Sequence, residues 1–314
     1  MTPPVALGID LGGTNCRGGL VDGDGHLRLR AEMSTDASNN FLPRFESFCY
    51  QLINQAGAAD LAVSHIGVGV PGVVDGHGRV LNAPNLPALH GVELAHLLRE
   101  RFGLPVQVGN DVDAITAGEA RCGAGRHSAD FLVIALGTGV GGGLLLQRRV
   151  WRGPVASTVE IGHVIVEPDG RLCGCGHRGC LEAYASGPGL VHSVELAGLR
   201  GEIGCLSLSA GITGPMVASA AQHGDVVARV AFAEAGRHLG TVIAGVINLL
   251  GLKTVIFAGS GATNLDLLRP TLEHTCRDAL FPGTPLPELV AAELGADAGI
   301  IGAALGAFGD DGFL

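Results

Sequence analysis

Two glycine-rich turns in this sequence could bind phosphate. DLGGT (residues 10–14) and GTG (residues 137–139) each follow an apolar stretch. Backbone N–H groups of such a turn can bind an anion without a lysine, and no G-x-x-x-x-G-K-[ST] P-loop is present. The strand-terminal GSGA (residues 259–262) is a third turn of this kind. The alternative for each turn is an ordinary tight hairpin.

Three polar residues at predicted strand ends could bind a cation or the hydroxyl groups of a ligand. Asp10 precedes Gly12 and Gly13, and a carboxylate beside phosphate requires a divalent cation between them, so Asp10 indicates Mg²⁺. Asn110 and Asp111 end another apolar stretch, where an amide and a carboxylate can bind neighbouring hydroxyls and accept a proton from one. The alternatives are that Asp10 caps its turn and that Asp111 is a helix N-cap.

A cysteine cluster provides a third chemical group. One imidazole and three thiolates form a full tetrahedral zinc set, contributed by His163, Cys173, Cys175 and Cys180. Four protein ligands leave no open position, so such a zinc would be structural. His177 could replace His163 as a ligand, and a redox pair of Cys173 and Cys175 is the competing interpretation. Glu160 and Glu182 flank the candidate ligands, where the loop could hold both towards a polar ligand.

Hydrophobic patterning predicts two α/β halves that position these groups. In the first half we expect three antiparallel strands within 5–32, strands at 65–72 and 105–111, and helices near 40–56, 92–102 and 112–122. In the second we expect a hairpin within 130–153, strands at 254–259 and 288–294, and helices near 187–200, 214–222, 225–249, 265–278 and 298–308. Both halves open with a strand, a glycine–threonine turn and a strand, which is a weak internal repeat. We expect two domains facing a cleft.

Two matches to G-x-G-x-x-G do not indicate a dinucleotide site. They are Gly67–Gly69–Gly72 and Gly137–Gly139–Gly142. Each follows a predicted strand, but neither opens a predicted helix, as the dinucleotide-binding fingerprint requires.

Composition limits the class of protein. The 314 residues suit two ordinary domains, and no uninterrupted apolar run reaches the ~20 residues of a membrane span. The N-terminal stretch lacks the basic region of a secretory signal, so we expect a cytoplasmic protein with no membrane partner. Its cysteines should then be thiols or metal ligands. A net charge of −10 without a basic stripe argues against nucleic acid as a partner.

Taken together, the motifs resemble the ROK family of sugar kinases and repressors. The matching stretches are DLGGT (10–14), GVPGVVD (69–75), APNLPAL (83–89), NDVDA (110–114), LGTGVGGG (136–143), EIGH (160–163) and CGCGHRGCLEAYAS (173–186). They cover nearly the whole chain in the family's order. The resemblance implies an actin-like, hexokinase-type α/β fold of two domains. We expect the smaller domain at 1–116 plus about 298–314, and the larger, with the zinc loop, at 117–297.

The resemblance implies ATP-dependent phosphorylation of a hexose, usually at its 6-hydroxyl. Asp111 looks like the general base, and Asn110, Asp111 and the backbone at Gly72 would hold the sugar. Glu160, His163 and Glu182 would hold its O1/O2 end, with His163 also on zinc. The residues that resemble ATP phosphate, Mg²⁺ and nucleotide elements are Asp10, Gly12, Gly13, Thr14, Thr138, Gly139, Gly259 and Gly261.

Three positions depart from the family pattern. Asp113 stands where an asparagine is frequent, Val159 replaces the glycine of GEIGH, and Asn15 replaces a lysine. None removes a proposed catalytic group. Asp113 adds negative charge that would raise the pKa of Asp111 if the two are close, and Val159 would stiffen the sugar loop.

Several alternatives stay open at this point. The family's repressors carry an N-terminal DNA-binding extension, whereas nine residues precede Asp10 here, so we expect no helix-turn-helix. A zinc hydrolase would need an open coordination position. Glucose is the leading substrate, and fructose, mannose, allose, N-acetylglucosamine and N-acetylmannosamine remain alternatives. As in the family, we expect a homodimer or homotetramer.

Overall fold

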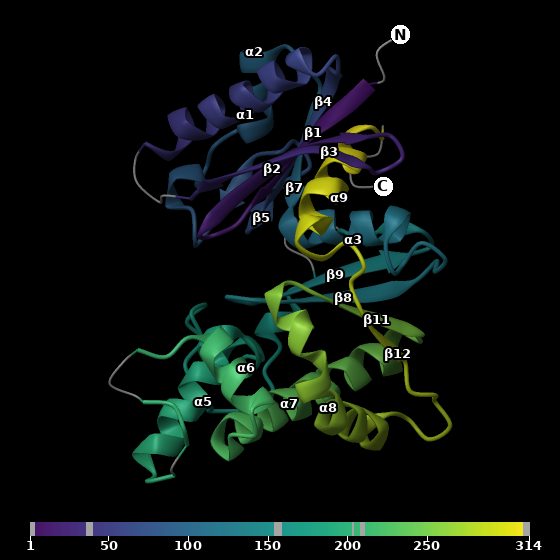
Figure 1. The fold of residues 1–314 in the computed structure, drawn as a ribbon. Helices are drawn as coiled ribbons and strands as arrows, with labels where there is room; N and C mark the ends of the chain where they lie inside the picture. The colour runs from purple at the N-terminus through teal and green to yellow at the C-terminus, as the bar shows by residue number, and fades with distance from the viewer. Residues whose placement is uncertain (1–3, 36–39, 154–158, 203, 208–210, 310–314) are drawn as a thin grey trace. The chain divides into compact units, whose positions relative to one another are not determined.

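The computed structural model describes residues 4–35, 40–153, 159–202, 204–207 and 211–309. The chain forms two compact units (Figure 1). Unit 1 comprises residues 1–133, 143–159 and 292–314, and unit 2 comprises residues 134–142 and 160–291. This division differs from the expected boundary at residue 116, which falls within a helix that belongs wholly to unit 1.

Unit 1 is built on a five-stranded sheet with the order β3-β2-β1-β4-β7. The strands are β1 (Pro4–Leu11), β2 (Asn15–Asp22), β3 (Leu27–Ser34), β4 (Ala62–Val70) and β7 (Val106–Asn110). The first three form the expected antiparallel meander, and β4 and β7 run parallel to β1. The register pairs Asp10 with Gly69 and Asn110 with Val70. The carboxyl ends of β1 and β7 therefore bring two predicted site residues to the same edge of the sheet.

Helices cover both faces of this sheet: α1 (Phe41–Ala58), α2 (Leu94–Phe102), α3 (Asp111–Cys122) and α9 (Ala298–Ala307). Successive residues of a strand point to opposite faces, and β2 shows which helix lies on each. A Cβ at Gly18 would meet Phe48 of α1, whereas one at Gly19 would approach Ile300 of α9. The sheet is thus sandwiched between α1 and α9, which are labelled in Figure 1.

Small residues let α9 approach the backbone of its neighbours closely. A Cβ at Gly8 of β1 would collide with the carbonyl of Ile300, and one at Gly67 of β4 with the carbonyl of Ala303. On its other side, Gly302 lies against the carbonyl of Ala114 in α3. The C-terminal helix is therefore an integral part of the N-terminal sheet's core.

A small hairpin follows β4 that the sequence analysis did not predict. It pairs β5 (Val73–Val74) with β6 (Val80–Asn82), and a short 3₁₀ helix, Pro87–Leu89, comes after it. Asp75 accepts the backbone N–H groups of His77 and Arg79 and so closes the turn. This hairpin confirms that the first G-x-G-x-x-G match does not open a helix.

The second five-stranded sheet has the order β10-β9-β8-β11-β12. Its strands are β8 (Phe131–Leu136), β9 (Val140–Leu146), β10 (Arg149–Val150), β11 (Thr254–Ala258) and β12 (Glu288–Ala291). Numbered along the chain, this is the strand order of the first sheet. The weak internal repeat of the sequence is therefore a repeat of sheet topology.

The α-helices that the structure describes in unit 2 are α4 (Glu182–Ala185), α5 (Gly187–Leu199), α6 (Gly214–Gln222), α7 (Val226–Leu250) and α8 (Leu265–Ala279). Within the described residues, α7 is the one helix long and apolar enough to cross a membrane, and most of its apolar window is buried in the protein. Gly236 and Gly240 let α8 pack closely on it, because a Cβ there would meet the carbonyls of Leu268 and Leu272. Helix α7 has the features of a core helix.

Candidate active site

Asn110 is the N-cap of α3. The alternative interpretation of Asp111 as the N-cap is therefore wrong by one residue. Its Oδ1 accepts the backbone N–H groups of Val112 (2.8 Å) and Asp113 (3.2 Å). Its Nδ2 donates to the carbonyl of Gly72 at 3.1 Å. These bonds assign the capping role to Asn110, fix its side chain, and bring the Gly72 carbonyl beside it.

Asp111 is the first residue of α3, at the edge where β7 ends. Burial, and after it the negative charge of Asp10, raise the pKa of its carboxyl to about 7. A bond from the Val112 N–H to Oδ1, at 3.0 Å, opposes this rise. A carboxyl that titrates near neutral pH can accept and release a proton under physiological conditions.

Asp113 contributes to the pKa of Asp111 as the sequence analysis expected, but its charge has the smallest effect among the causes. Its carboxylate pairs with Arg152 at 3.4 Å, which offsets part of its charge. The aspartate at this family position therefore adjusts the acidity of Asp111 without controlling it.

Asp10 and the β1–β2 turn form the first phosphate-type turn. Burial raises the pKa of Asp10, against the opposing charge of Arg17, which lies 3.8 Å away. In α9, Gly299 makes room for this carboxyl, since a Cβ there would lie 2.7 Å from its Cγ. Gly13 and Thr14 are exposed at the turn, and the Gly12 N–H donates to the carbonyl of Asn15. A buried carboxylate beside exposed glycine and threonine suits an anion bridged by a divalent cation.

The β8–β9 turn is the matching element of unit 2. Thr138 is exposed, and the Gly137 N–H closes the turn by donating to the carbonyl of Gly139 at 3.0 Å. Glu182 contacts this turn: its Oε2 accepts the Val140 N–H at 3.0 Å. A Cβ at Gly139 would lie 2.5 Å from the same oxygen. A side chain at residue 139 would therefore displace the Glu182 carboxylate from this position, a contact that the sequence did not indicate.

Gly259 and Gly261 follow β11 and pack on the end of β8. Gly259 has a φ of +76°, and a Cβ there would collide with the carbonyl of Leu136. Gly261 lies against the Leu136 side chain. The packing alone requires glycine here, and it brings this turn to the same residue from which the β8–β9 turn begins.

The four predicted zinc ligands converge in unit 2. One ligand atom from each of His163, Cys173, Cys175 and Cys180 lies within 4.8 Å of the other three. The Cys173 Sγ is 3.8 Å from the His163 Nδ1, and the Cys175 Sγ is 3.6 Å from the Cys180 Sγ. Zinc with Zn–S bonds of about 2.3 Å separates tetrahedral ligand atoms by roughly 3.5–4 Å. The donor set fits a tetrahedral zinc ion.

The geometry favours His163 over His177 as the imidazole of this cluster. His177 Nδ1 lies 3.6 Å from the Cys175 Sγ, but His177 is not in the group whose ligand atoms are mutually close. His163 ends the short 3₁₀ helix Ile161–His163, which begins directly after Glu160. Glu182 Oε1 lies 3.6 Å from the Cys173 Sγ. The cysteine cluster thus carries one predicted sugar ligand, His163, and touches a second, Glu182.

Val159 precedes this segment in a strained conformation. Its φ is +52°, in the left-handed region that suits glycine. A β-branched side chain is rarely found there. Replacing the family's glycine with valine therefore strains the backbone at the residue that directly precedes Glu160.

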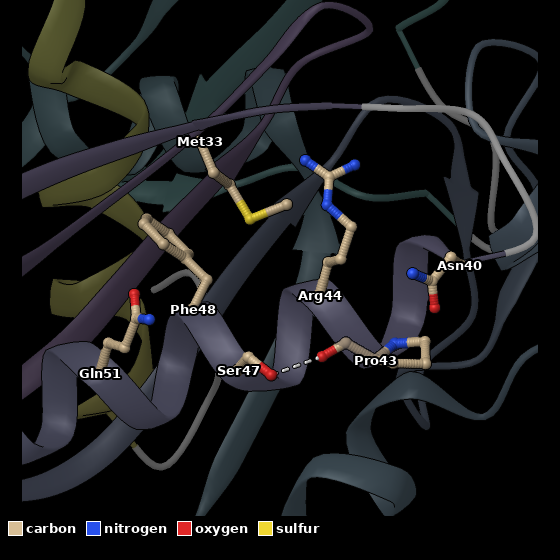
Figure 2. Close-up of a pocket in the computed structure, with 7 residues that line it drawn as sticks. All are labelled: Met33, Asn40, Pro43, Arg44, Ser47, Phe48 and Gln51. Atoms are coloured by element: carbon tan, nitrogen blue, oxygen red, sulfur yellow. Dashed lines mark hydrogen bonds between the residues drawn. The ribbon is translucent and has the colours of Figure 1, made fainter.

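A surface pocket in unit 1 has none of the predicted site residues in its lining. It is bounded by β3 and α1 and lined by Met33, Asn40, Pro43, Arg44, Ser47, Phe48 and Gln51 (Figure 2). The Ser47 hydroxyl that faces it already donates to the carbonyl of Pro43 in its own helix, at 2.9 Å. The pocket has no group in common with the strand-edge site.

Comparison with known proteins identifies the family. Residues 6–307 match the ROK family. The chain belongs to the ROK family. Curated relatives include a glucokinase of Streptomyces coelicolor, 31% identical with 96% of both chains covered, and an N-acetylmannosamine kinase of Escherichia fergusonii, 31% identical with 97% of this chain and 98% of the relative covered. These full-length matches place the chain among the family's sugar kinases.

Solved structures show the same fold. The chain is similar to a ROK family glucokinase of Streptomyces griseus, solved with glucose and AMPPNP, with a TM-score of 0.83, 33% identity and coverage of 97% and 99% of the two chains. It is also similar to a ROK family transcriptional regulator, a homologue of the Escherichia coli Mlc protein. That match has a TM-score of 0.88 and 27% identity, and covers 96% of this chain and 77% of the regulator. The expected actin-like, hexokinase-type fold is confirmed.

Proposed function

We propose that this ROK family member phosphorylates a hexose with ATP, and that glucose is its preferred substrate. The observation that carries the proposal is Asp111, a carboxyl with a pKa of about 7 at a strand edge beside Asp10. The likeness to glucokinases and to a glucokinase solved with glucose and AMPPNP supports the choice of sugar and of phosphoryl donor.

In the proposed reaction Asp111 acts as the general base. Its carboxylate accepts the proton of the attacking sugar hydroxyl as that oxygen bonds to the γ-phosphorus of ATP, and ADP leaves with the electrons of the broken bond. Asn110, fixed by its cap and its bond to Gly72, binds a neighbouring hydroxyl. Because Asn110 and Asp111 are adjacent in the chain, their spacing is fixed where β7 passes into α3.

Asp10 and the two hairpin turns would bind the nucleotide. When bound, Mg²⁺ neutralises phosphate charge that builds up during transfer. The Asp10 carboxylate fits a role in holding this ion or its waters, with Gly13 and Thr14 donating to phosphate oxygens and Gly12 closing the turn that carries them. Thr138 and Gly139 would bind phosphate in unit 2, and Gly259 and Gly261 would approach the nucleoside.

Glu160, His163 and Glu182 would bind the O1/O2 end of the sugar. Carboxylates accept hydrogen bonds from adjacent hydroxyls, and a site built to accept them discriminates strongly against sugars that lack them. His163 would use Nδ1 for zinc, the nitrogen that lies 3.8 Å from the Cys173 Sγ, and Nε2 for the sugar. The zinc would be structural, because His163 and three thiolates fill a tetrahedral shell.

The experiment that tests this function measures ADP release with ATP, Mg²⁺ and each of a panel of hexoses. Glucose should give the highest kcat/KM, above fructose, mannose, allose, N-acetylglucosamine and N-acetylmannosamine. A higher kcat/KM for N-acetylmannosamine would transfer the assignment to the other group of relatives. Absence of turnover with every hexose, in protein that binds sugar, would favour a regulator and contradict the kinase assignment.

We also propose a homodimer or homotetramer. Light scattering coupled to size-exclusion chromatography measures the mass directly. The 31.9 kDa mass of the chain should appear doubled or quadrupled. A particle of monomer mass at working concentration contradicts this part of the proposal.

A further inference from the structure

Arg171 lies two residues before Cys173, in the loop that carries the cysteines, and its side chain is turned into unit 2 with 13% exposed. Its guanidinium pairs with the Glu234 carboxylate of α7 at 2.7 Å and donates to the Ser193 hydroxyl of α5 at 2.9 Å. The Ser193 hydroxyl also bonds to the same Glu234 oxygen, at 2.8 Å. The three side chains form a closed, charge-assisted triangle, in which each polar group restrains the other two.

The same arginine reaches the short helix that presents Glu182. Its Nη1 donates to the carbonyls of Ala183 in α4 and Gly189 in α5, both at 3.3 Å. The guanidinium stacks over the Tyr184 ring, 4.3 Å from its centroid. The planar fork of an arginine can make these contacts at once, whereas a lysine ammonium cannot. Arg171 thus holds the residue that directly follows Glu182.

The backbone of Arg171 joins the two arms of the cysteine loop. Its N–H donates to the Tyr184 hydroxyl at 2.9 Å, and its carbonyl accepts the Gly179 N–H at 2.8 Å. Gly179 directly precedes Cys180. Arg171 therefore lies two residues before Cys173, hydrogen-bonds to the residue that precedes Cys180, and hydrogen-bonds to the residue that follows Glu182. In the described contacts it touches none of the proposed metal-ligand atoms.

We propose that Arg171 is a positioning residue, which holds the cysteine loop and α4 so that the thiolates and Glu182 keep the geometry needed to bind zinc and sugar. The inference rests on the proposed function for its sugar-binding part. It predicts that Arg171 acts through Cys173, Cys180 and Glu182. Groups that orient metal ligands from behind typically change metal affinity or activity 10–100-fold when they are removed.

The test compares Arg171→Gln with Arg178→Gln. Arg178 is a matched control: it lies two residues from Cys180 in the same loop, but is exposed and donates to the Gly170 carbonyl alone in the described contacts. Zinc affinity is measured by competition with a chelating dye, which does not depend on turnover. In Arg171→Gln zinc affinity should fall about 10-fold, while Arg178→Gln should stay within about twofold of wild type.

Steady-state kinetics give the second readout. Arg171→Gln should raise the sugar KM about 10-fold and leave the ATP KM within about twofold. Arg171→Lys keeps the charge but loses the fork, so it should fall between Arg171→Gln and wild type. A general loss of folding would instead change all the kinetic constants together.

Wild-type zinc affinity and sugar KM in folded Arg171→Gln would overturn the proposal. If that variant does not fold, Glu234→Gln removes the ion pair while keeping an oxygen for Ser193, and it should weaken zinc and raise the sugar KM in the same direction. Wild-type zinc affinity and sugar KM in Glu234→Gln would also overturn the proposal. If wild type phosphorylates no hexose, the proposed function fails, but the zinc competition still decides the role of Arg171.

Discussion

The two units carry their site residues in different ways. In unit 1, Asp10, Asn110 and Asp111 lie where regular strands end, and the backbone of β1, β7 and α3 fixes them. In unit 2, Glu160, His163 and the cysteines lie in a segment with little regular structure. The backbone hydrogen bonds of this segment close turns and isolated bridges and do not form a continuous ladder, so its shape also depends on side-chain contacts. The proposed reacting groups thus lie at the ends of regular strands, whereas the proposed sugar-selecting groups lie in a segment held by turns, bridges and side-chain contacts.

The largest expected effect is the loss of kcat when Asp111, in unit 1, is replaced. Asp111→Asn keeps the shape but cannot accept the proton, so kcat should fall by roughly 10²–10⁴-fold, with the sugar KM much less changed. Single-site kinetics over a range of glucose concentrations measure both constants. Asp113→Asn is the control, because Asp113 is paired with Arg152 and should retain most turnover. Robust turnover by Asp111→Asn would sink the general-base assignment.

Removing a cysteine of the unit 2 cluster should change the sugar KM and leave kcat nearly unchanged. Cys175→Ser removes one of the four proposed ligands, so bound zinc should be lost and the sugar KM should rise about 10-fold or more, with the ATP KM nearly unchanged. Metal content and the two KM values are the measurements. Cys205→Ser, at an exposed cysteine outside the cluster, should change neither. A zinc-free Cys175→Ser protein with a wild-type sugar KM would show that the cluster does not shape the sugar site.

The pH dependence should follow the unit 1 group alone. Asp111 must be deprotonated to act, so kcat/KM should rise about tenfold per pH unit below its pKa of about 7 and level off above it. Asp113→Asn removes a nearby negative charge, so the midpoint should move to lower pH. A rate profile from pH 5.5 to 8.5 tests both. A flat profile in wild type would mean that no group with this pKa controls the reaction.

The raised pKa of Asp111 also predicts how the stability of the fold changes with pH. The direction is opposite to that of a carboxylate whose pKa is lowered by folding. A carboxyl whose pKa is raised by folding destabilises the folded state as pH rises from its unfolded value near 4 to its folded value near 7. Asp111→Asn should therefore raise the melting temperature at pH 8 and have almost no effect at pH 4. Thermal unfolding at the two pH values measures this. Equal shifts at both would contradict the burial of Asp111 as the cause of its raised pKa.

The smallest expected effect is at Val159. Val159→Gly relieves a left-handed conformation that costs a β-branched residue about 1–2 kcal/mol. The greater freedom of glycine in the unfolded chain takes back about 0.5–1 kcal/mol, so the variant should be more stable by up to about 1 kcal/mol. Urea denaturation measures the difference. A clear loss of stability would show that the valine side chain makes contacts that outweigh its backbone strain.

Most of the fold could be predicted from the sequence, because glycine and aspartate mark the strand ends and apolar periodicity marks the helices. The helices expected near 214–222 and 225–249 are α6 (Gly214–Gln222) and α7 (Val226–Leu250). The β5–β6 hairpin was missed because its strands have two and three residues, too short for a period to show. Four-residue α4 was missed for the same reason.

The site was less predictable than the fold where it depends on distant contacts. The sequence placed Asn110 and Asp111 at a strand end, but could not say which of them caps the helix; the bonds to Val112 and Asp113 decide it. Arg171 gave no signal, since a lone arginine in a loop resembles any surface cation. Its partner Glu234 lies 63 residues away, and no short motif links the two.

The position of α9 has a consequence for the order in which the protein can mature on the ribosome. The glycine-lined face of β1 and β4 is closed by residues 298–307, which are synthesised long after the strands that they cover. Until they emerge, that apolar face of the first sheet lacks the helix that packs on it. All of unit 2 precedes them in the chain. The half that is translated first is therefore the half that is finished last.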